Sequence, residues 1–429
     1  MDIFGKNIMI LGKGVSGKAA IEALNGIAKR VWFYEGEDCS ADIIITSPGI
    51  ATHSIFDYAI RHNIPVISEL ELGFILNKTP VIAITGTNGK TTVTRLIGDI
   101  LSKKFKTAVC GNIGLPFSAI VHGDHEIAVV EASSFQLERC YQFKPQIAVI
   151  TNITEDHLDR HGTMQNYIDI KMSISKNQTA DDYFIIPTDL IKHLLKNNQT
   201  FTFESNTAHN KYSHLTTQKT TPKVILSDKS AYRNCGFLEY NGEKIISLSS
   251  IKIEGEHNKQ NIMQAMIVAK LMGIENEDIE AAVSEFEMDR HRCELVSEKG
   301  GKRWYDDSKA TNIDACVKAC ESMKGTSALI LGGSDKGENY EELFRRLPKG
   351  IKVVFLMGEV KDKLRAASGE SRFDVLCVGV EDLSEAVRLS GDLIVDNVLL
   401  SPAAASFDRY KDYKERGEEF RKRINLSLL

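Results

Sequence analysis

Short apolar runs alternate with stretches of helical periodicity along the whole chain, and glycines or polar turns separate them. Within residues 1–78, apolar runs at 8–11, 31–34 and 43–46 predict strands, and residues 19–24 predict a helix. Strands that alternate with helices are typical of α/β domains with a parallel sheet. The pattern therefore predicts an α/β unit over the first 78 residues.

The same alternation continues through two longer segments, residues 79–289 and 290–429. Their predicted strands are 81–84, 127–130, 147–151, 328–331, 353–357, 375–378 and 396–400. Between about 196 and 235 the chain is polar and poor in aromatic residues, which favours an insertion on the surface. We expect a doubly wound sheet in the last segment and, at about 150 residues per domain, roughly three domains in all.

The strand at 81–84 runs directly into Thr85-Gly86-Thr87-Asn88-Gly89-Lys90-Thr91-Thr92. Glycines let successive backbone N–H groups turn toward an anion, and a helix that begins near Thr91 adds its positive end. Lys90 can reach the outer phosphates, and the Thr91 hydroxyl can hold Mg²⁺. Two residues separate Gly86 from Gly89, where the usual phosphate loop has four. The segment predicts a nucleoside triphosphate site, with a ligand-free strand–turn–helix corner as the alternative.

A second glycine-rich turn, Gly12-Lys13-Gly14-Val15-Ser16-Gly17, follows the first strand, and Glu35 lies 18 residues beyond Gly17. Taken alone, this pattern is the fingerprint of a dinucleotide site and favours a nicotinamide-dependent dehydrogenase. Hydride transfer has no use for the phosphate loop at Lys90, so we expect a different diphosphate here. Tight strand–helix packing is the alternative. Ser47, in the turn after a strand, would line the same crevice.

Polar residues also follow the strand at 127–130. Glu131 ends this strand, where phosphate-loop folds place a carboxylate that faces Mg²⁺, and an exposed strand-end glutamate is the alternative. Ser133 and Gln136 come next and could orient a substrate.

A polar cluster follows the strand at 147–151 and contains His157. A single histidine is more often structural than a ligand, but one at this sheet edge can bind a second metal. Lys171 is ambiguous, because an ammonium repels Mg²⁺ whereas carbamylation by CO₂ would make the side chain an anionic oxygen ligand.

Composition limits the partners. The chain has 429 residues, 26% charged and 42% hydrophobic, with a net charge of −5, and no apolar run approaches the length of a membrane span. Neither nucleic acid nor a membrane is indicated as a partner. The first residues run into a strand, so no signal or transit peptide is apparent and we expect a cytoplasmic protein. Eight cysteines without a CxxC pair favour free thiols over a disulfide or zinc framework.

Several motifs together carry a resemblance to a known family. They are Gly86-Thr87-Asn88-Gly89-Lys90-Thr91, Gly111-Asn112-Ile113-Gly114, Glu131 with Ser133-Ser134-Phe135-Gln136-Leu137, Glu155-Asp156-His157-Leu158-Asp159 and Gly255-Glu256-His257-Asn258. With these motifs, nearly the whole chain resembles the Mur ligases of bacterial cell-wall synthesis. Asp307-Ser308-Lys309-Ala310-Thr311-Asn312 and residues 400–408 further resemble the D-glutamate-adding members of that family.

The resemblance implies an α/β protein of three domains. They are a Rossmann-like N-terminal domain that binds a UDP-linked substrate (1–78), a central P-loop ATPase-like domain (79–289) and a Rossmann-like C-terminal domain that binds an amino acid (290–429). The implied reaction belongs to peptidoglycan precursor synthesis. ATP phosphorylates the terminal carboxylate of UDP-N-acetylmuramoyl-L-alanine, and D-glutamate attacks the acyl phosphate. We expect a monomer that uses ATP and two Mg²⁺ ions.

The family's site residues carry over by position. The resemblance implies Lys90, Asn112, His157 and Lys171 for catalysis, with Mg²⁺ ligands Thr91, Glu131, His157 and carbamylated Lys171. ATP would contact residues 86–92 together with Asn258, Asn261, Arg292 and Asp307. The UDP-linked substrate would contact Gly14, Ser16, Glu35, Ser47, Ser133 and Gln136. D-Glutamate would contact Lys309, Thr311, Lys336, Ser406 and the backbone near Tyr413.

Simpler interpretations stay open for several of these residues. Asn258 and Asn261 could cap a helix, Asp307 could cap the helix around 315–320, and Lys336 could be structural.

Two other functions also stay open. A folylpolyglutamate-synthase-like amide ligase would need no glycine-rich domain at 12–17, and a nucleotide switch or scaffold would need no amino-acid site.

Only 11 residues separate Glu35 from Ser47, so the N-terminal domain is shorter than the family pattern.

Overall fold

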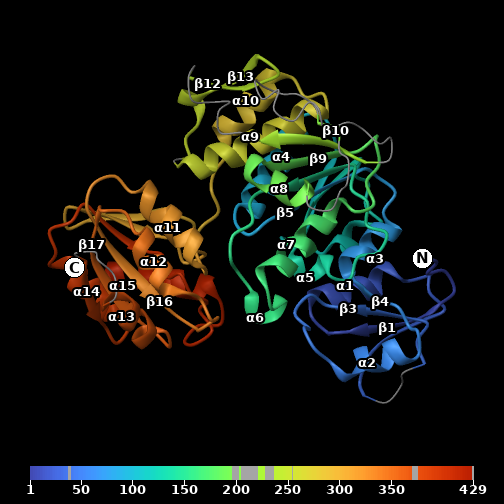
Figure 1. The fold of residues 1–429 in the computed structure, drawn as a ribbon, viewed down its shortest axis with the longest axis horizontal. Helices are drawn as coiled ribbons and strands as arrows, with labels where there is room; N and C mark the ends of the chain where they lie inside the picture. The colour runs from blue at the N-terminus through green and yellow to red at the C-terminus, as the bar shows by residue number, and fades with distance from the viewer. Residues whose placement is uncertain are drawn as a thin grey trace. The chain divides into compact units, whose positions relative to one another are not determined.

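The computed structural model describes residues 1–36, 40–195, 202–203, 221–227, 236–253, 255–369 and 375–427. Helices pack on parallel sheets, as Figure 1 shows. The chain divides into two compact units, of which the first comprises Met1–Ile153, Arg160–Lys252 and Asn258–Phe286. The second comprises Thr154–Asp159, Ile253–His257 and Glu287–Leu429. The predicted α/β fold class is confirmed, while the division into three domains stays a prediction.

The first unit begins with a four-stranded parallel sheet in the order β2-β1-β3-β4. Its elements are β1 (Asn7–Leu11), α1 (Val15–Ala23), β2 (Arg30–Phe33), β3 (Ile43–Thr46), α2 (Ser54–Arg61), β4 (Val66–Ser68) and α3 (Glu69–Leu76). Alternate residues of β1 and β3 enter two separate apolar clusters, because helices cover both faces of a parallel sheet. Helix α3 ties this sheet to the rest of the unit: Glu71 accepts the backbone N–H groups of Gln142 and Phe143 at 2.6 and 3.0 Å.

The rest of the first unit is built on a seven-stranded parallel sheet in the order β10-β11-β9-β8-β5-β7-β6. The strands are β5 (Val81–Thr85), β6 (Thr107–Gly111), β7 (Ile127–Glu131), β8 (Ile147–Ile150), β9 (Tyr183–Pro187), β10 (Thr202–Phe203) and β11 (Lys223–Ser227). All residues of β5, β7 and β8 are buried, which fits strands with a helical layer on each face.

Helices and a hairpin complete this part of the chain. The α-helices are α4 (Lys90–Leu101), α5 (Ser134–Leu137), α6 (Leu158–His161), α7 (Met164–Met172), α8 (Ile191–Leu195), α9 (Glu256–Leu271) and α10 (Asn276–Glu285). Short 3₁₀ helices are η1 (Phe117–Ile120), η2 (Ser173–Ser175), η3 (Thr188–Leu190) and η5 (Leu248–Ser250). The antiparallel hairpin consists of β12 (Phe237–Tyr240) and β13 (Glu243–Ser247).

The prediction that residues between about 196 and 235 form a surface insertion is wrong for one strand, β11. β11 pairs in parallel with β9, and its Val224 and Ile225 are fully buried. A short Val-Ile-Leu run inside a polar stretch gives only a weak strand signal, and neighbouring strands decided its place. Apart from 202–203 and 221–227, this insertion lies outside the described residues.

The second unit holds a six-stranded sheet in the order β14-β15-β19-β16-β17-β18. Its strands are β14 (Glu294–Lys299), β15 (Lys302–Asp306), β16 (Ser327–Gly332), β17 (Ile351–Met357), β18 (Leu376–Gly379) and β19 (Asn397–Leu400). Its helices are α11 (Ile313–Ser322), α12 (Tyr340–Arg346), α13 (Lys361–Gly369), α14 (Leu383–Gly391) and α15 (Tyr413–Ser427). Leu329 and Leu331 face one apolar cluster, and Ala328 and Ile330 face another, so β16 has packed residues on both faces.

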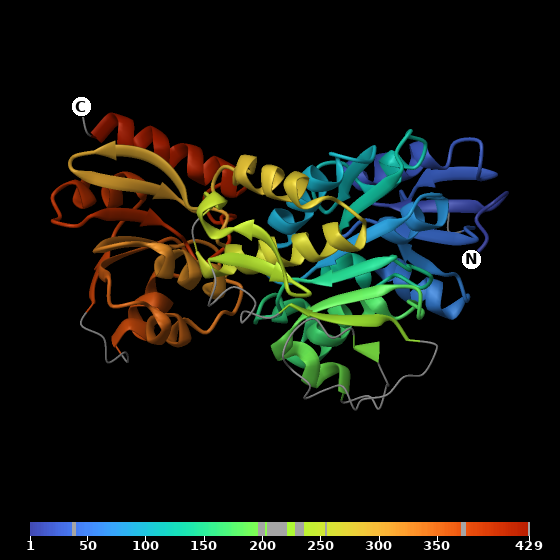
Figure 2. The ribbon, with the colours of Figure 1, turned by 90° about the horizontal axis from the view of Figure 1, so that it is seen from above.

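The edge hairpin of β14 and β15 is antiparallel, which the sequence did not predict, while the other strand pairs of this sheet are parallel. Helix α15 runs beside β15 (Figure 2). Within the described ranges, every helix is too short or too polar to cross a membrane.

Candidate functional site

The loop between β5 and α4 requires glycine at two positions. Gly86 and Gly89 have φ values of +144° and +83°. A Cβ atom on Gly86 would lie 1.9 Å from Thr151 Oγ1, and one on Gly89 would lie 2.6 Å from Asn261 Oδ1. Only glycine combines this backbone conformation with this close an approach. The loop can therefore present its backbone N–H groups at the start of α4, where anions bind.

The end of β8 holds this loop in place. Asn152 Oδ1 accepts the Asn88 N–H at 3.0 Å, and Asn152 Nδ2 donates to Asn88 O at 2.8 Å. Thr151 Oγ1 donates to the same carbonyl at 2.6 Å. We did not predict Asn152 as a site residue, although the polar cluster after residue 151 was a signal for it.

Lys90 lies in the first turn of α4, and its ammonium group contacts the loop itself. Its Nζ donates to Gly86 O at 2.8 Å and to Thr87 O at 2.7 Å. Thr91, which is half-buried, and the buried Thr92 follow in the same turn. The structure thus gathers all the predicted residues of the loop at one edge of the central sheet.

Glu131, at the end of β7, lies at the same edge. β7 is the parallel neighbour of β5, and Glu131 is 2% exposed. Asn112 Nδ2 donates to Glu131 Oε1 at 2.8 Å, and the Asn112 N–H donates to Glu131 O at 2.8 Å. Within the described part of the chain, Glu131 Oε2 has no hydrogen-bond partner. A buried carboxylate oxygen without a donor is suited to a hard cation.

Lys171, on α7, is 1% exposed and lies against the nucleotide loop. Its Nζ donates to Gly86 O at 2.7 Å and lies 4.6 Å from the centre of the Tyr167 ring. The Tyr167 hydroxyl shares a hydrogen bond with Thr87 Oγ1 at 3.2 Å. The structure therefore brings Lys171 close to the backbone that would hold a phosphate.

His157 has a left-handed backbone conformation, with φ at +54°. Its Nε2 lies 3.6 Å from Asp156 Oδ2, which accepts from Asn312 Nδ2 at 3.1 Å. These residues belong to the second unit, and Lys171 and Glu131 belong to the first. A shared metal on His157 and Lys171 therefore stays a prediction.

Ser133 and Gln136 form the cap of α5. The Ser133 N–H and Oγ donate to Gln136 Oε1 at 3.0 and 2.9 Å, and the Gln136 N–H donates to Ser133 Oγ at 3.3 Å. This reciprocal arrangement is a capping box. Both side chains thus have a structural role besides the predicted substrate contact.

The glycine-rich turn of the first sheet packs α1 closely on β1. A Cβ atom on Gly17 would lie 1.9 Å from Gly12 O, whereas one on Gly14, the residue before α1, would meet nothing within 4 Å. Ser16 lies in the first turn of α1. The turn can therefore serve both packing and a ligand.

Two further predicted substrate contacts lie around this turn. Lys13 pairs with Glu35 at 2.6 Å, and that hydrogen bond lowers the pKa of the Glu35 carboxyl. Ser47 Oγ is buried without a hydrogen-bond partner among the described residues, which leaves it available to a ligand.

Asn258 and Asn261 lie inside α9 and are buried, so neither is the residue that precedes the helix. Asn261 Nδ2 donates to Asn258 Oδ1 at 3.3 Å. The interpretation of Asp307 as a cap is wrong, because Asn312 Oδ1 accepts the Ala315 N–H and begins α11. The remaining role for the side chains of Asn258, Asn261 and Asp307 is to contact a ligand or to pack in the core.

Asp307 is 4% exposed and follows β15. It accepts from Ser401 Oγ at 2.6 Å and from the Cys293 N–H at 3.1 Å. Burial raises the pKa of the Asp307 carboxyl to about 7, against the opposing hydrogen bond from Ser401. Arg292 lies in a tight turn between His291 and Cys293, whose φ values are +65° and +44°.

Loops at one edge of the second unit's sheet carry the predicted amino-acid contacts. Lys309 Nζ lies 3.1 Å from Asp289 Oδ2 and 5.8 Å from the centre of the Tyr413 ring. Ser406 is buried, and Thr311 and Lys336 are half-buried. Ser334 pairs with Ala405 through the backbone, and its buried Oγ has no partner in the described ranges.

Arg416, on α15, is fully buried and ties these loops together. Its Nη2 donates to Ser308 O and Ala404 O at 2.9 and 3.0 Å. Its Nη1 donates to Ala405 O and Gly332 O at 3.1 and 3.3 Å. Burial lowers the pKa of Arg416 to about 10. No sequence pattern indicated this role, because one arginine among many charged residues in a helix does not stand out.

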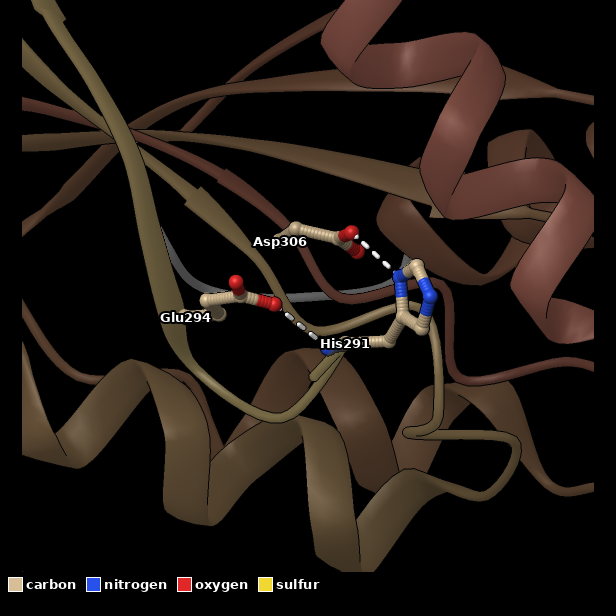
Figure 3. A group of neighbouring side chains, drawn as sticks. All are labelled: His291, Glu294 and Asp306. Carbon is tan, nitrogen blue, oxygen red and sulfur yellow. Dashed lines mark hydrogen bonds and ion pairs between the residues drawn. The ribbon is translucent and has the colours of Figure 1, made fainter. Parts of the chain in front are cut away.

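His291, Glu294 and Asp306 are close enough to hold a metal ion (Figure 3). Asp306 Oδ2 accepts from His291 Nδ1 at 2.7 Å, and Glu294 Oε2 accepts the His291 N–H at 2.8 Å. Arg421 pairs with Glu294 and lies 3.6 Å from Asp306. Because a guanidinium already neutralises both carboxylates, we interpret the group as an ion-pair network that holds α15 to the edge hairpin.

A phosphate loop at the carboxyl edge of a parallel sheet makes the first unit a P-loop-type nucleotide-binding fold. Residues 84–269 match the model of the Mur ligase middle domain, and residues 291–403 match the model described as Mur ligase, glutamate ligase domain. The chain belongs to the Mur ligase family.

Two relatives show how far the likeness extends. The UDP-N-acetylmuramoylalanine–D-glutamate ligase of Caldanaerobacter subterraneus subsp. tengcongensis is 34% identical, with 99% of each chain covered. The protein of the same name from Caldicellulosiruptor saccharolyticus is 36% identical, with 99% of this chain and 100% of the relative covered.

Solved structures share the fold at low identity. MurF ligase from Thermotoga maritima in complex with ADP has a TM-score of 0.63 at 17% identity and covers 99% of this chain and 96% of its own. Folylpolyglutamate synthase of Mycobacterium tuberculosis, complexed with ADP and AMPPCP, has a TM-score of 0.58 at 15% identity over 78% of this chain and 90% of its own.

Proposed function

We propose that this protein is an ATP-dependent ligase that adds D-glutamate to UDP-N-acetylmuramoyl-L-alanine in peptidoglycan precursor synthesis. The observation that carries the proposal is the nucleotide loop at residues 86–92, which shares a sheet edge with the buried carboxylate of Glu131. Relatives that match over nearly the whole chain bear the name of this ligase, which supports the choice of substrates.

The proposed reaction has two steps. A carboxylate oxygen of the terminal alanine attacks the γ-phosphorus of ATP, the bond to the β–γ bridging oxygen breaks, and ADP leaves. The D-glutamate amine then attacks the acyl carbon, loses a proton and displaces inorganic phosphate. Because two anions meet in the first step, the cation of Lys90 beside the loop stabilises it, and Asn112 positions the phosphoryl and acyl oxygens.

Mg²⁺, when bound, neutralises charge on the phosphates. The described residues fit such an ion, because Glu131 Oε2 is buried and has no hydrogen-bond partner among them. We propose Glu131 and Thr91 as ligands of one ion, and His157 with carbamylated Lys171 as ligands of a second. Carbamylation joins CO₂ to the neutral amine with release of one proton, and the remaining N–H can still donate to Gly86 O.

The other predicted contacts belong to the same proposal. Adenosine would contact Asn258, Asn261, Arg292 and Asp307, and the UDP-linked substrate would contact Gly14, Ser16, Glu35, Ser47, Ser133 and Gln136. D-Glutamate would contact Lys309, Thr311, Lys336, Ser406 and the backbone near Tyr413. We add Ser334, because its buried hydroxyl has no hydrogen-bond partner within the described residues and its backbone pairs with Ala405.

A folylpolyglutamate-synthase-like amide ligase is the second candidate, because that enzyme shares the fold. The glycine-rich turn at 12–17 favours the UDP-linked substrate over a pterin.

The test is phosphate release from ATP with UDP-N-acetylmuramoyl-L-alanine, in the presence of D-glutamate, L-glutamate, glycine or no amino acid. We expect release that requires both the nucleotide sugar and D-glutamate. Release that requires neither, or that requires a pterin instead, would overturn the proposal.

We further propose a cytoplasmic monomer. Sedimentation at assay concentration should give the mass of one chain, and a dimer mass would contradict this part of the proposal.

A further inference from the structure

Helix α6 ends in Arg160 and His161, two side chains that contact separate ligand-facing segments of the first unit. The His161 side chain is 1% exposed, and that of Arg160 is 14% exposed. Neither residue is among the proposed ligand contacts. Both belong to the first unit together with every residue that they contact below.

On one side, His161 contacts the helix that carries the predicted substrate residues. Its Nε2 shares a hydrogen bond with Ser134 Oγ at 3.0 Å, and its Nδ1 lies 3.1 Å from Glu138 Oε1. Ser134 lies between the capping residues Ser133 and Gln136. The imidazole is therefore hydrogen-bonded to the first residue of α5 and lies close to the residue just after its end.

On the other side, the imidazole contacts the aromatic residue beside the nucleotide loop. The ring centres of His161 and Tyr167 lie 5.1 Å apart, and those of His161 and Phe135 lie 5.5 Å apart. Tyr167 in turn shares its hydroxyl hydrogen bond with Thr87 Oγ1 at 3.2 Å. A continuous set of contacts thus runs from Thr87 through Tyr167 and His161 to Ser134.

Arg160 extends this set to the first sheet. Its guanidinium donates to Glu138 through Nε at 3.3 Å and Nη2 at 2.7 Å, and through Nη1 to Pro48 O at 3.2 Å. It also lies 4.1 Å from the centre of the Phe135 ring. Pro48 follows Ser47, one of the proposed contacts of the UDP-linked substrate.

We propose that His161 is a positioning residue that aligns two sites at once: Ser134 and α5 at the UDP-linked substrate, and Tyr167 at the nucleotide loop. The proposal rests on the proposed function. Imidazole suits this role because its two nitrogens lie on different edges of one flat ring, so polar contacts and ring packing come from the same side chain. Its side chain is 1% exposed, so its effect passes through Ser134 and Tyr167.

Two substitutions separate the two halves of this role. His161→Phe retains a flat ring beside Tyr167 and loses both polar contacts. His161→Gln retains an amide that can reach Ser134 and loses the ring. Loss of one hydrogen bond or ring contact should weaken an apparent affinity roughly 2- to 12-fold. The control is His125→Phe, which removes a partly buried histidine whose Nε2 lies 3.0 Å from Asn77 Oδ1, away from these segments.

The experiment measures the KM values of all three substrates at saturating levels of the other two. We expect His161→Phe to raise KM for UDP-N-acetylmuramoyl-L-alanine at least about fivefold, and His161→Gln to raise KM for ATP more than that for the UDP-linked substrate. KM for D-glutamate should stay within the range of the control. Ser134→Ala combined with His161→Phe should cost no more than the larger single effect, because both remove the same contact.

Equal changes in all three KM values, or KM values like those of His125→Phe, would overturn the inference. Wild-type enzyme distinguishes this failure from failure of the proposed function, which would show as turnover independent of the UDP-linked substrate. Calorimetric affinities for ADP and for UDP-N-acetylmuramoyl-L-alanine test, without turnover, whether each variant weakens one ligand more than the other. If the Phe variant does not fold, two other variants still test the inference. His161→Gln should weaken ATP more, and Ser134→Ala should weaken the UDP-linked substrate more.

Discussion

Asn112 Nδ2 donates to Glu131 Oε1 at 2.8 Å, while Glu131 Oε2, on the same buried carboxylate, has no hydrogen-bond partner among the described residues. Glu131 ends β7, and Asn112 follows the neighbouring parallel strand β6, whose register pairs Gly111 with Glu131. A carboxylate with one oxygen held and the other available is oriented for a ligand.

Glu131→Gln should therefore lower turnover at least about 100-fold, the scale of losing one preorganised electrostatic contact, and raise the Mg²⁺ concentration needed for half-maximal activity. The amide oxygen can still accept from Asn112, so the thermal unfolding midpoint should not fall. The control is Glu126→Gln, next to the other end of β7, where the carboxylate accepts the Lys106 N–H at 2.8 Å on the surface. Wild-type turnover with an unchanged Mg²⁺ requirement would remove Glu131 from the metal site.

Lys171→Ala should abolish nearly all activity, and formate or acetate in the buffer should restore part of it, because a small carboxylate can replace the carbamate. In wild-type protein, ¹³CO₂ should give a carbamate signal in the carbon NMR spectrum that the variant lacks. Lys176→Ala serves as the control, since Lys176 contacts Cys140 O and the Tyr141 ring instead of the nucleotide loop. An active Lys171→Ala protein, or wild type without the signal, would refute the carbamate.

Arg416→Lys should raise KM for D-glutamate at least about tenfold and leave KM for the UDP-linked substrate unchanged. A lysine cannot reach four carbonyls from two loops and the end of β16 as a planar guanidinium does, so the loops that carry Lys309 and Ser406 would move. Carbonyls left without donors should lower the unfolding free energy by about 1–3 kcal/mol.

The matched control for this experiment is Arg423→Lys on the same helix, because Arg423 pairs only locally with Glu419 at 2.6 Å in the contacts that the structure describes. Equal KM values for D-glutamate in the two variants would count against a positioning role of Arg416.

Asp307→Asn should change how stability depends on pH. The folded pKa of about 7 lies above the ordinary 3.8, so the folded protein holds this proton more tightly than the unfolded chain does. The free energy of unfolding that Asp307 contributes is therefore fully present below pH 3.8 and is lost as pH rises to about 7. The upper bound on that loss is about 4 kcal/mol.

Since asparagine can still accept from Cys293 and donate to Ser401, the variant should gain stability over wild type between pH 4 and 7. Urea unfolding across this range measures the difference. Asp396→Asn is the control of opposite sign, because hydrogen bonds from Thr326 lower the pKa of that exposed carboxyl and stabilise the fold above its unfolded pKa. A pH-independent difference for Asp307→Asn would contradict the expectation.

Local chemistry explains which elements could be predicted. The apolar run at Val81–Thr85, the glycines at 86 and 89 and Lys90 all act on their immediate neighbours, so a strand, a loop and a helix followed from their order. The buried β-strands of the second unit's sheet could be located within a few residues for the same reason. The antiparallel pairing of β14 with β15 could not be predicted, because it depends on which strands become neighbours in the folded sheet.

The nucleotide loop, the α/β class and the family could be recognised from the amino-acid sequence, because these depend on the order of residue types along a short stretch of chain. Four relationships depend on the packed structure: Asn152 clamps the loop, Val224 lies inside a sheet, Arg416 joins two loops to the end of β16, and His161 lies between Ser134 and Tyr167. The physical reason is that hydrogen bonds and ring contacts between residues distant in sequence leave no periodicity and no spacing to recognise. They exist only once the strands have been ordered and the helices packed on them.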